Sequence, residues 1–361
     1  MYCSYPYFCT MQVDYLIIGQ GISGTFLSRE LLQAGRSVLV IDIDNPRSAS
    51  RVASGVINPV TGRRIVKTWM IDELLPFARE AYRDIGSDLQ IDCIAQKDII
   101  DCFTTPQMRM AFTGRYEQDP EYLQLPADEN DQRAWLQYDF GYGIIQPCFW
   151  VDMGSLLQQY RRHLKQHGQL VEEVFDPFQL VVKDDEVQYG AVTAGKIIFC
   201  DGVAGFNNSF FQNLPYAASK GEAVLVEIPG MPDTHIIKKG YSLVPWKENT
   251  FWLGSTYLWE FEHDAPTPGF YQFAKNWLQL TVKMPFTIVD HLAALRPATL
   301  ERRPFVGLHP VHKAVGIFNG MGTKGCSLAP YFARQLADLL INNVAVKPEA
   351  DVQRFRRVLS R

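Results

Sequence analysis

The stretch GQGISG at residues 19–24 has the glycine spacing that many proteins use to bind the pyrophosphate of a dinucleotide. Gly19 would allow a tight turn, Gly21 would let the backbone approach the phosphates, and Gly24 would let the next helix pack close to the preceding strand. Asp42 follows about twenty residues later, where a carboxylate accepts hydrogen bonds from a ribose. The acid favours an unphosphorylated adenosine ribose, so the stretch predicts NAD or FAD rather than NADP.

The sequence around this loop predicts the elements that must position it. Residues 13–18 are a continuous apolar run typical of a buried parallel strand, and residues 25–35 form an amphipathic helical pattern that ends at Gly35. Residues 37–42 have the composition of a second strand. In this strand–helix–strand order, the helix N-terminus presents its backbone N–H groups and positive dipole end to a phosphate. This context makes the motif far more specific than the glycine spacing alone.

A second stretch with the same spacing, GMGTKG, occupies residues 320–325. It follows a predicted strand at 314–320 and opens a predicted helix at 326–341, but the residues after that helix include no strand ending in an acid. The second loop therefore lacks the half of the fold that would bind a second ribose. Its helix N-terminus suits an electron-rich group such as the edge of a reduced flavin. The sequence thus predicts one dinucleotide, FAD, held from both ends.

The composition excludes several other classes of function. The chain has 361 residues, a net charge of −4 and no basic stripe, so nucleic acid is an unlikely partner. Its seven cysteines are scattered without a C-x-x-C pair, and its histidines lack metal-ligand spacing, so we expect no metal site. No run of 18 apolar residues predicts a membrane span. We expect a cytoplasmic protein whose residues 1–10 are an unstructured leader.

Four motifs in order give the chain a resemblance to the FAD-dependent family of D-amino-acid oxidase, glycine oxidase and sarcosine oxidase. They are the N-terminal glycine loop with its second strand, SASRVASGVINP at 48–59, KIIFCDGVAG at 196–205, and the region 292–330 with LRPAT and the second glycine loop. The resemblance covers nearly the whole chain from Met11. Asp201 is a departure, because the family usually has a small residue at this position.

The resemblance implies an α/β fold in which a Rossmann-type FAD-binding domain carries an inserted α+β substrate domain, with an antiparallel sheet over the flavin. We assign residues 11–85, 145–215 and 312–361 to FAD binding, and residues 86–144 and 216–311 to the substrate domain. Together the glycine loops and the resemblance predict FAD contacts at Gly19, Gly21, Ile22, Ser23, Gly24, Asp42, Ser50, Arg51, Ser54, Gly55, Val56, Val174, Asp201, Gly202, Gly322, Thr323, Lys324 and Gly325. In the second loop, the N–H groups of Gly322, Lys324 and Gly325 are expected to face the cofactor.

The resemblance also implies where substrate binds. Arg296 would hold a substrate carboxylate, since a guanidinium forms a two-pronged pair with that group. Tyr241 and Tyr257 would line the pocket from two neighbouring strands, with Ser242 as the alternative to Tyr241 because the alignment is uncertain by one residue. We expect non-covalent FAD, because no cysteine lies between Cys200 and Cys326.

The predicted function is FAD-dependent oxidation of a small amine or amino acid. A hydride passes from the carbon next to nitrogen to flavin N5, and oxygen or another acceptor then takes the electrons. Two alternatives remain. One is carboxymethyl removal from the wobble uridine of tRNA, because GMGTKG and SGVINP are similar to motifs of the FAD domain of that enzyme. The other is a flavoprotein subunit without turnover of its own.

Overall fold

The computed structural model describes residues 11–62 and 64–361, so the predicted leader at residues 1–10 lies outside the described residues. Contacts divide the chain into two compact units. Unit 1 comprises the described residues up to Pro46 together with Leu157–Ala218 and Pro297–Arg361. Unit 2 comprises Arg47–Leu156 and Ser219–Arg296.

These units differ in extent from the ranges predicted for cofactor and substrate binding. Residues 47–85 and 145–156, predicted to bind FAD, belong to unit 2, while residues 216–218 and 297–311, predicted for the substrate domain, belong to unit 1. Strand pairing explains this division: β10 (Phe149–Val151) pairs with both β3 (Val56–Ile57) and β6 (Ile94–Gln96), whereas β20 (Phe305–Leu308) pairs with β21 (Val315–Asn319). Compactness does not test which residues touch a cofactor, so the predicted ranges stay predictions.

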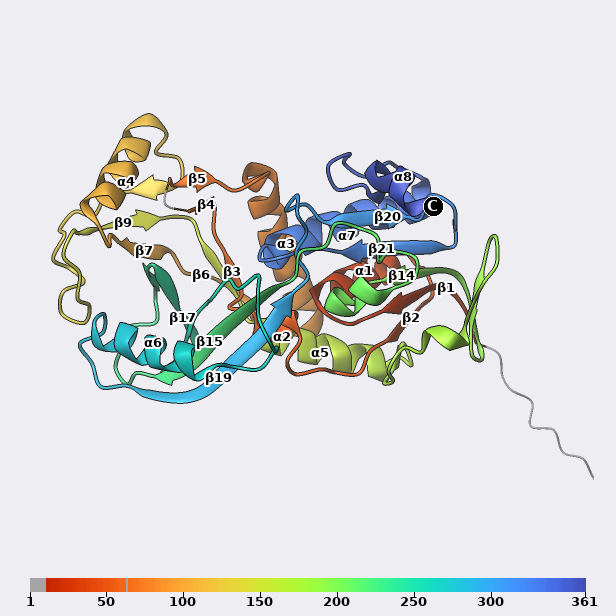
Figure 1. Ribbon diagram of the computed structural model, residues 1–361, viewed down its shortest axis with the longest axis horizontal. Coiled ribbons are helices and arrows are strands. Elements are labelled where there is room, and N and C mark those ends of the chain that lie inside the picture. The colour runs from red at the N-terminus through yellow and green to blue at the C-terminus, as the bar shows by residue number, and fades with distance from the viewer. Residues whose placement is uncertain (1–10, 63) are drawn as a thin grey trace, which may run out of the picture. The chain divides into compact units, whose positions relative to one another are not determined.

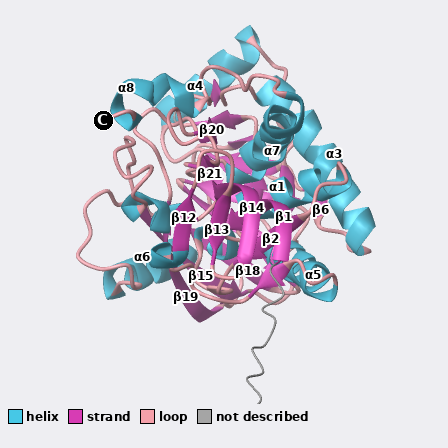
Figure 2. Ribbon diagram, turned by 90° about the vertical axis from the view of Figure 1, so that its right-hand side faces the viewer, coloured by secondary structure: helices cyan, strands magenta, loops and turns pink. Residues whose placement is uncertain are grey.

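Unit 1 is built on a sheet with the strand order β11-β2-β1-β14-β13-β12, in which β21 joins β14 and β20 joins β21. Figure 2 shows β12, β13, β14, β1 and β2 side by side. β1, β2, β11, β14 and β21 run parallel to their neighbours in that group. The other bounds in this sheet are β1 Met11–Ile18, β2 Val38–Ile41, β11 Leu170–Val171, β12 Leu180–Val182, β13 Val187–Tyr189 and β14 Val192–Phe199.

The central strands of unit 1 are apolar because both of their faces are covered. Leu16 and Ile17 of β1 and Ile197 and Ile198 of β14 are fully buried. Helix α1 packs against α7, which follows β21. The helical segments of this unit are α1 Ile22–Gln33, η2 Gly202–Asn207, α7 Gly325–Asn342, η1 Pro177–Gln179, η3 Val352–Phe355 and α8 Arg356–Leu359. Helix α5 (Met153–Gln166) begins in unit 2 and continues into unit 1.

Unit 2 contains a mostly antiparallel sheet with the order β19-β15-β18-β17-β16-β7-β9-β8 (Figure 1). Its bounds are β7 Ile99–Cys102, β8 Leu123–Gln124, β9 Tyr142–Ile145, β15 Ser219–Glu227, β16 Ile236–Lys239, β17 Tyr241–Lys247, β18 Thr250–Gly254 and β19 Thr287–Arg296. The β16–β7 pair is parallel. A small sheet of β3, β10 and β6 and the hairpin of β4 (Val60–Thr61) and β5 (Val66–Lys67) complete its strands as described.

The helices of unit 2 are α2 Ala49–Val52, α3 Ile71–Leu89, α4 Pro106–Gln118 and α6 Pro268–Gln279. Helices α4 and α6 begin for the same local reason. Thr105 and Thr267 accept a first-turn backbone N–H, and Pro106 and Pro268 take the first helical position. The predicted fold class is confirmed: unit 1 has the parallel α/β architecture of a Rossmann-type domain, and unit 2 is an α+β unit with an antiparallel sheet.

Candidate functional site

The first glycine loop makes the tight turn that its sequence predicts. Gly19 has φ +100° and donates its N–H to Ile41 O at 2.8 Å. A side chain on Gly24 would lie 1.8 Å from Gly19 O, so this glycine lets α1 pack directly against the loop. Gly21, at the N-cap of α1, has no side chain to occupy the first-turn N–H groups. The predicted Ile22, Ser23 and Gly24 form that first turn, where the helix suits a phosphate.

Asp42 lies where β2 ends and is held by several donors within unit 1. Its Oδ2 accepts the backbone N–H of Gln20 at 2.8 Å, while its Oδ1 accepts Asp44 N at 2.8 Å and Arg161 Nη1 at 2.6 Å. Sequence reasoning missed Arg161. Nothing in the run QQYRRHL distinguishes its buried arginine from its exposed one, so only the fold could have found it. The carboxylate is thus oriented by the protein alone.

Three of the predicted cofactor motifs converge at one edge of the sheet. β14 is parallel to β1 and to β21, with Ile18 opposite Phe199 and Phe199 opposite Ile317. All three strands therefore end at the same edge, where a ligand of an open parallel sheet binds. The first loop follows β1, Asp201 and Gly202 follow β14, and the second loop follows β21. Val174, three residues beyond β11, is exposed near this edge's outer strand.

The second glycine loop bonds two of its backbone N–H groups within the protein. Gly320 and Gly322 have φ of +80° and +56°, which turn the chain into α7. Gly322 donates its N–H to Pro297 O at 3.0 Å, and Lys324 donates to Met321 O at 3.2 Å. Two of the three N–H groups expected to face the cofactor are therefore already bonded to protein carbonyls, one of Pro297 and one of Met321. The contact of this loop with FAD stays a prediction. Thr323 is exposed.

The two loops lie next to each other. A side chain on Gly325 would be 3.5 Å from Ile22 Cγ2. Asn319, just before the second loop, donates from Nδ2 to Gly202 O at 2.7 Å and to Asp201 Oδ1 at 3.1 Å. Burial raises the pKa of Asp201 to about 7, and hydrogen bonds from its neighbours only partly oppose the shift. The two loops are thus close enough for one bound molecule to contact both, and that contact stays a prediction.

These features fit an FAD on the side of unit 1. The glycines remove side chains where a pyrophosphate would approach, and Asp42 is oriented at the end of the second strand. Among the residues that the structure describes, no group of three or more His, Cys, Asp or Glu could hold a metal ion. None of the described helices is long and apolar enough to cross a membrane.

The second predicted cofactor motif, residues 48–59, lies within unit 2. Ser50 and Arg51 are in α2, which contacts β19, and Val52 O accepts the indole N–H of Trp252 at 3.0 Å. Gly55 has φ +77°, and a side chain there would lie 2.0 Å from Val151 O. The motif is thus fastened to the strands around it. The partly buried Ser50, Arg51, Ser54 and Val56 follow this backbone path.

Arg296 ends β19 and lies over a glycine that leaves it room. A side chain on Gly221 would lie 1.9 Å from Arg296 Nη2. Arg296 donates from Nη1 to Thr256 O at 3.1 Å and from Nη2 to Ser255 Oγ at 2.7 Å. Its guanidinium carbon is 4.5 Å from the centre of the Tyr257 ring. Sequence reasoning did not find Gly221, because a glycine in a strand has several possible causes.

No carboxylate balances this guanidinium among residues 11–62 and 64–361. Burial lowers the pKa of Arg296, but an arginine in a protein stays charged. Buried charges are normally paired, because an unpaired charge loses its hydration without compensation. The structure therefore holds a largely buried cation in need of an anion.

The strand register separates the two other predicted substrate residues. Ala223, Gly254 and Ser242 lie opposite one another across β15, β18 and β17, so they share one sheet face. Gly221 lies two residues before Ala223 and therefore on the same face, where the Arg296 guanidinium packs over it. Tyr241 points to the other face, where its ring is 4.7 Å from that of Phe273 in α6. The structure thus brings Tyr257 to Arg296 but does not bring Tyr241 there. Ser242, the alternative, lies on the face of Arg296.

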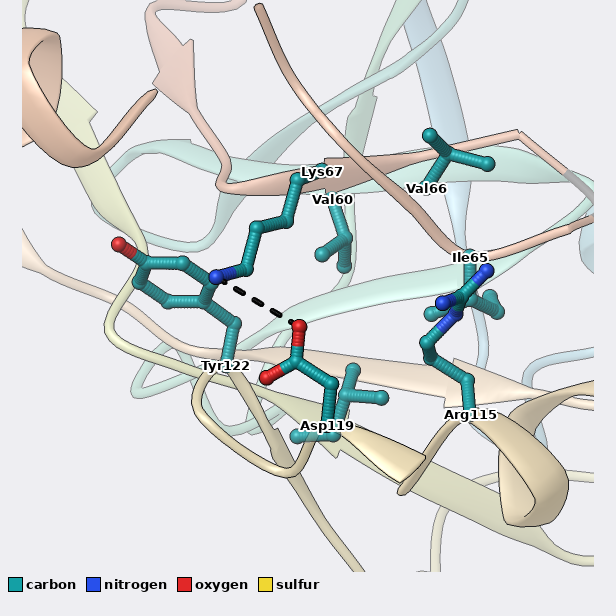
Figure 3. Close-up of a pocket in the computed structure, with 8 residues that line it drawn as sticks. Val60, Ile65, Val66, Lys67, Arg115, Asp119 and Tyr122 are labelled. Atoms are coloured by element: carbon teal, nitrogen blue, oxygen red, sulfur yellow. Dashed lines mark ion pairs between the residues drawn. The ribbon is translucent and has the colours of Figure 1, made fainter. Parts of the chain in front are cut away.

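A pocket of about 210 Å³ in unit 2 contains none of the predicted site residues (Figure 3). Lys67 lies 3.5 Å from Asp119 at this pocket and also pairs with Asp72 and Glu121. Its charge is therefore balanced locally, in contrast to that of Arg296. The lining residues are Val60, Ile65, Val66, Lys67, Arg115, Asp119, Tyr122 and Leu123.

Comparisons with known proteins agree with these features. The sequence model of the family described as "FAD dependent oxidoreductase" (DAO) matches residues 14–339. Glycine oxidase of Bacillus licheniformis is 21% identical over 91% of this chain and 93% of its own length. Among solved structures, glycine oxidase from Geobacillus kaustophilus has a TM-score of 0.77 at 18% identity, covering 93% of this chain and 96% of that one.

Iminodiacetate oxidase from Chelativorans sp. BNC1 has a TM-score of 0.75 at 19% identity, covering 96% of this chain and 98% of that one. At these identities, the likeness of the structures shows the fold. The match of the family model extends over most of the chain and therefore also shows the family. The chain belongs to the DAO family of FAD-dependent oxidoreductases.

Proposed function

We propose that this enzyme oxidises a small amine that carries a carboxylate, such as an amino acid, and that Arg296 binds the carboxylate. The observation that carries the proposal is the largely buried guanidinium, which has no acidic partner among the residues that the structure describes. Arg296 has five N–H donors, of which Thr256 O and Ser255 Oγ each take one. The remaining donors suffice for the two-pronged pair that a planar guanidinium forms with a carboxylate.

The relatives named above support this substrate class. They are named as oxidases of glycine and of iminodiacetate, and both compounds combine an amine with a carboxylate. Gly221 leaves room on its sheet face for the guanidinium of Arg296 itself. Tyr257, stacked on the guanidinium and half exposed, would help to fix the plane of the pair. Ser242 on the same face is a further candidate for contact with substrate.

Bound FAD would supply the hydride acceptor, flavin N5, and pass the electrons to oxygen or another acceptor. The protein's part is orientation: a carboxylate fixed on Arg296 limits the positions of the adjoining carbon and nitrogen. The positive charge of Arg296 and the loss of water also favour the neutral amine, because both lower the pKa of a nearby ammonium. No dedicated base is required for a neutral amine to give up a hydride.

We further propose that FAD is held non-covalently. The five described cysteines, at positions 93, 102, 148, 200 and 326, are all buried and form no disulfide. Burial raises the pKa of Cys93 and Cys102 to about 12 and that of Cys200 well above its ordinary value. A covalent flavin bond through cysteine needs an accessible thiolate, which these surroundings disfavour. Denaturation in acid should release the flavin into the supernatant.

The test is an anaerobic titration of the purified, yellow protein. Glycine, sarcosine, proline, iminodiacetate and a panel of D-amino acids are added in turn, and the flavin band near ~450 nm is followed. Bleaching by one of them gives the substrate. A protein that binds FAD but bleaches with none of these compounds contradicts the proposed substrate class while leaving the cofactor in place.

Arg296→Met and Arg296→Lys then test the role of the guanidinium. We expect Arg296→Met to lower kcat/KM about 100-fold or more, because the substrate carboxylate loses a desolvated charged partner. Arg296→Lys should recover part of this loss through its charge, though not through its geometry. FAD absorbance should persist in both variants. Arg357→Met, at an exposed arginine of α8, serves as the control and should leave kcat/KM unchanged. Unchanged kinetics in Arg296→Met would refute carboxylate binding there.

A further inference from the structure

Arg161 of α5 is a buried arginine whose every donor has a protein acceptor. Its side chain is 4% exposed. Nε donates to Glu172 Oε1 at 3.1 Å, and Nη2 donates to the same oxygen at 2.8 Å and to Asp42 O at 2.9 Å. Nη1 donates to Asp42 Oδ1 at 2.6 Å and to Gln20 Oε1 at 3.3 Å. The five N–H groups of a guanidinium are therefore all used.

The acceptors come from three segments that a dinucleotide fold must align. Gln20 belongs to the first glycine loop, Asp42 ends β2, and Glu172 follows β11. Arg161 binds the side chain of Asp42 and also its backbone carbonyl, so it fixes both the rotamer and the end of the strand. The rigid fork of a guanidinium holds such an arrangement, whereas a lysine presents a single point charge.

The hydrogen bonds that the Asp42 carboxylate already accepts limit how a ligand can bind to it. A carboxylate offers about four acceptor positions, and three are taken here by Gln20 N, Asp44 N and Arg161 Nη1. The one that remains has a direction set by the other three. A ribose hydroxyl that binds Asp42 must therefore come to a position that Arg161 defines.

We propose that Arg161 is a positioning residue for the adenosine end of FAD, acting through Asp42 and Gln20. The proposal rests on FAD as the cofactor of the family and is independent of the substrate proposed above. Arg161 lies in α5, far along the chain from both glycine loops. The affinity for FAD thus depends on a helix outside the glycine-loop motif.

The variants Arg161→Met and Arg161→Lys test the proposal, with Arg162→Met as the matched control. Arg162 is the next residue of the same helix but is exposed, and its Nη1 lies 3.4 Å from Gln159 Oε1. Arg161→Met should raise the Kd for FAD about 10-fold or more, since charged hydrogen bonds that orient Asp42 are lost. Arg161→Lys should fall between Arg161→Met and wild type. The control should stay within about 2-fold of wild type.

Two further readouts separate positioning from a structural role. Competition by ADP, which contains the ribose and pyrophosphate but no flavin, should weaken by the same factor as FAD binding. In an Asp42→Asn background, Arg161→Met should add less than about 2-fold to the Kd, because both changes remove the same interaction. The visible spectrum of the bound flavin should stay unchanged.

The contrary results are equally specific. If Arg161→Met lowers the melting temperature of the apoprotein while Kd values for FAD and ADP stay within about 2-fold, Arg161 only stabilises the fold. If the effects of Arg161→Met and Asp42→Asn multiply, Arg161 does not act through Asp42. Should Arg161→Met fail to fold, Arg161→Lys carries the same comparison, because it keeps the charge that balances Asp42 and Glu172.

Discussion

The loops Gly19–Gly24 and Gly320–Gly325 have the same glycine spacing, and each connects a parallel strand to a helix. They differ in what their backbone groups contact. In the first loop, Gly24 packs directly against Gly19 O, and Gln20 N donates a hydrogen bond to the Asp42 carboxylate. In the second, Gly322 N and Lys324 N are bonded to carbonyls of the protein. Lys324 is the N-cap of helix α7, and its side chain cannot accept an N–H.

The difference teaches that the spacing specifies a strand-to-helix turn, and that the contacts around the turn specify the ligand group. The first loop has an oriented acid beside it, which suits a nucleotide with its ribose. Among the described residues, no strand that ends in such an acid follows the second loop. Two N–H groups of this loop bind protein carbonyls, so its contribution to a ligand comes chiefly from the end of α7. This asymmetry favours one dinucleotide over two. Three substitutions can break or sharpen the contrast.

The largest effect is expected for Gly24→Ala. Helix propensity alone predicts a gain of about 1 kcal/mol when a helical glycine becomes alanine. The new Cβ would, however, lie 1.8 Å from Gly19 O, a backbone atom that cannot move without the loop. We expect a loss of about 3 kcal/mol in the free energy of unfolding together with loss of FAD binding. Urea unfolding and FAD titration measure both.

Gly114→Ala in α4 provides the control for this substitution, since an added Cβ there meets nothing within 4 Å. That variant should be as stable as wild type or slightly more stable. If Gly24→Ala were also neutral, the first loop would not be as tightly packed as its geometry indicates. The contrast between the two loops would then disappear.

How much of this could be predicted from sequence depends on the range over which each feature is determined. The strands, both loops and Asp42 follow from apolar runs and glycine spacing, which are local properties. Arg161 does not, because two adjacent arginines in α5 look alike until the fold buries one of them. The sequence could not decide between Tyr241 and Ser242 as the residue near Arg296, for another reason. Strand side chains alternate, so an alignment error of one residue reverses the sheet face.

The second prediction concerns Asp201, which links the two loops. Its Oδ1 accepts Asn319 Nδ2 ahead of the second loop, and its Cα would be 3.3 Å from a side chain on Gly19. Burial raises its pKa from 3.8 to about 7 in the folded protein. The folded state therefore binds a proton between these values that the unfolded state has released. Stability should be greatest below pH 4 as far as this group is concerned, and its contribution should be lost as the pH rises to about 7.

Asp201→Asn keeps the acceptor for Asn319 and removes the titration. At pH 8 the variant should be more stable than wild type by roughly 1–3 kcal/mol, and near pH 5 the difference should shrink. The FAD affinity of the wild type should also fall as the pH rises, because an ionised Asp201 would repel the pyrophosphate, while that of the variant should stay flat. Thermal melts and FAD titrations from pH 5 to 8 are the measurements. Parallel pH profiles for the two proteins would show that Asp201 does not titrate in this range.

The smallest effect is expected for Gly322→Ala in the second loop. Gly322 has φ +56°, but an added Cβ would meet only Ala298, with its Cβ at 3.6 Å. The cost is therefore that of a left-handed alanine, about 1 kcal/mol, with no steric clash. Gly322→Asn should cost less, because asparagine tolerates this conformation. If Gly322→Ala instead abolished FAD binding as Gly24→Ala is expected to do, a ligand would have to approach the second loop as closely as the first. The two loops would then be equivalent in function despite their different hydrogen bonds.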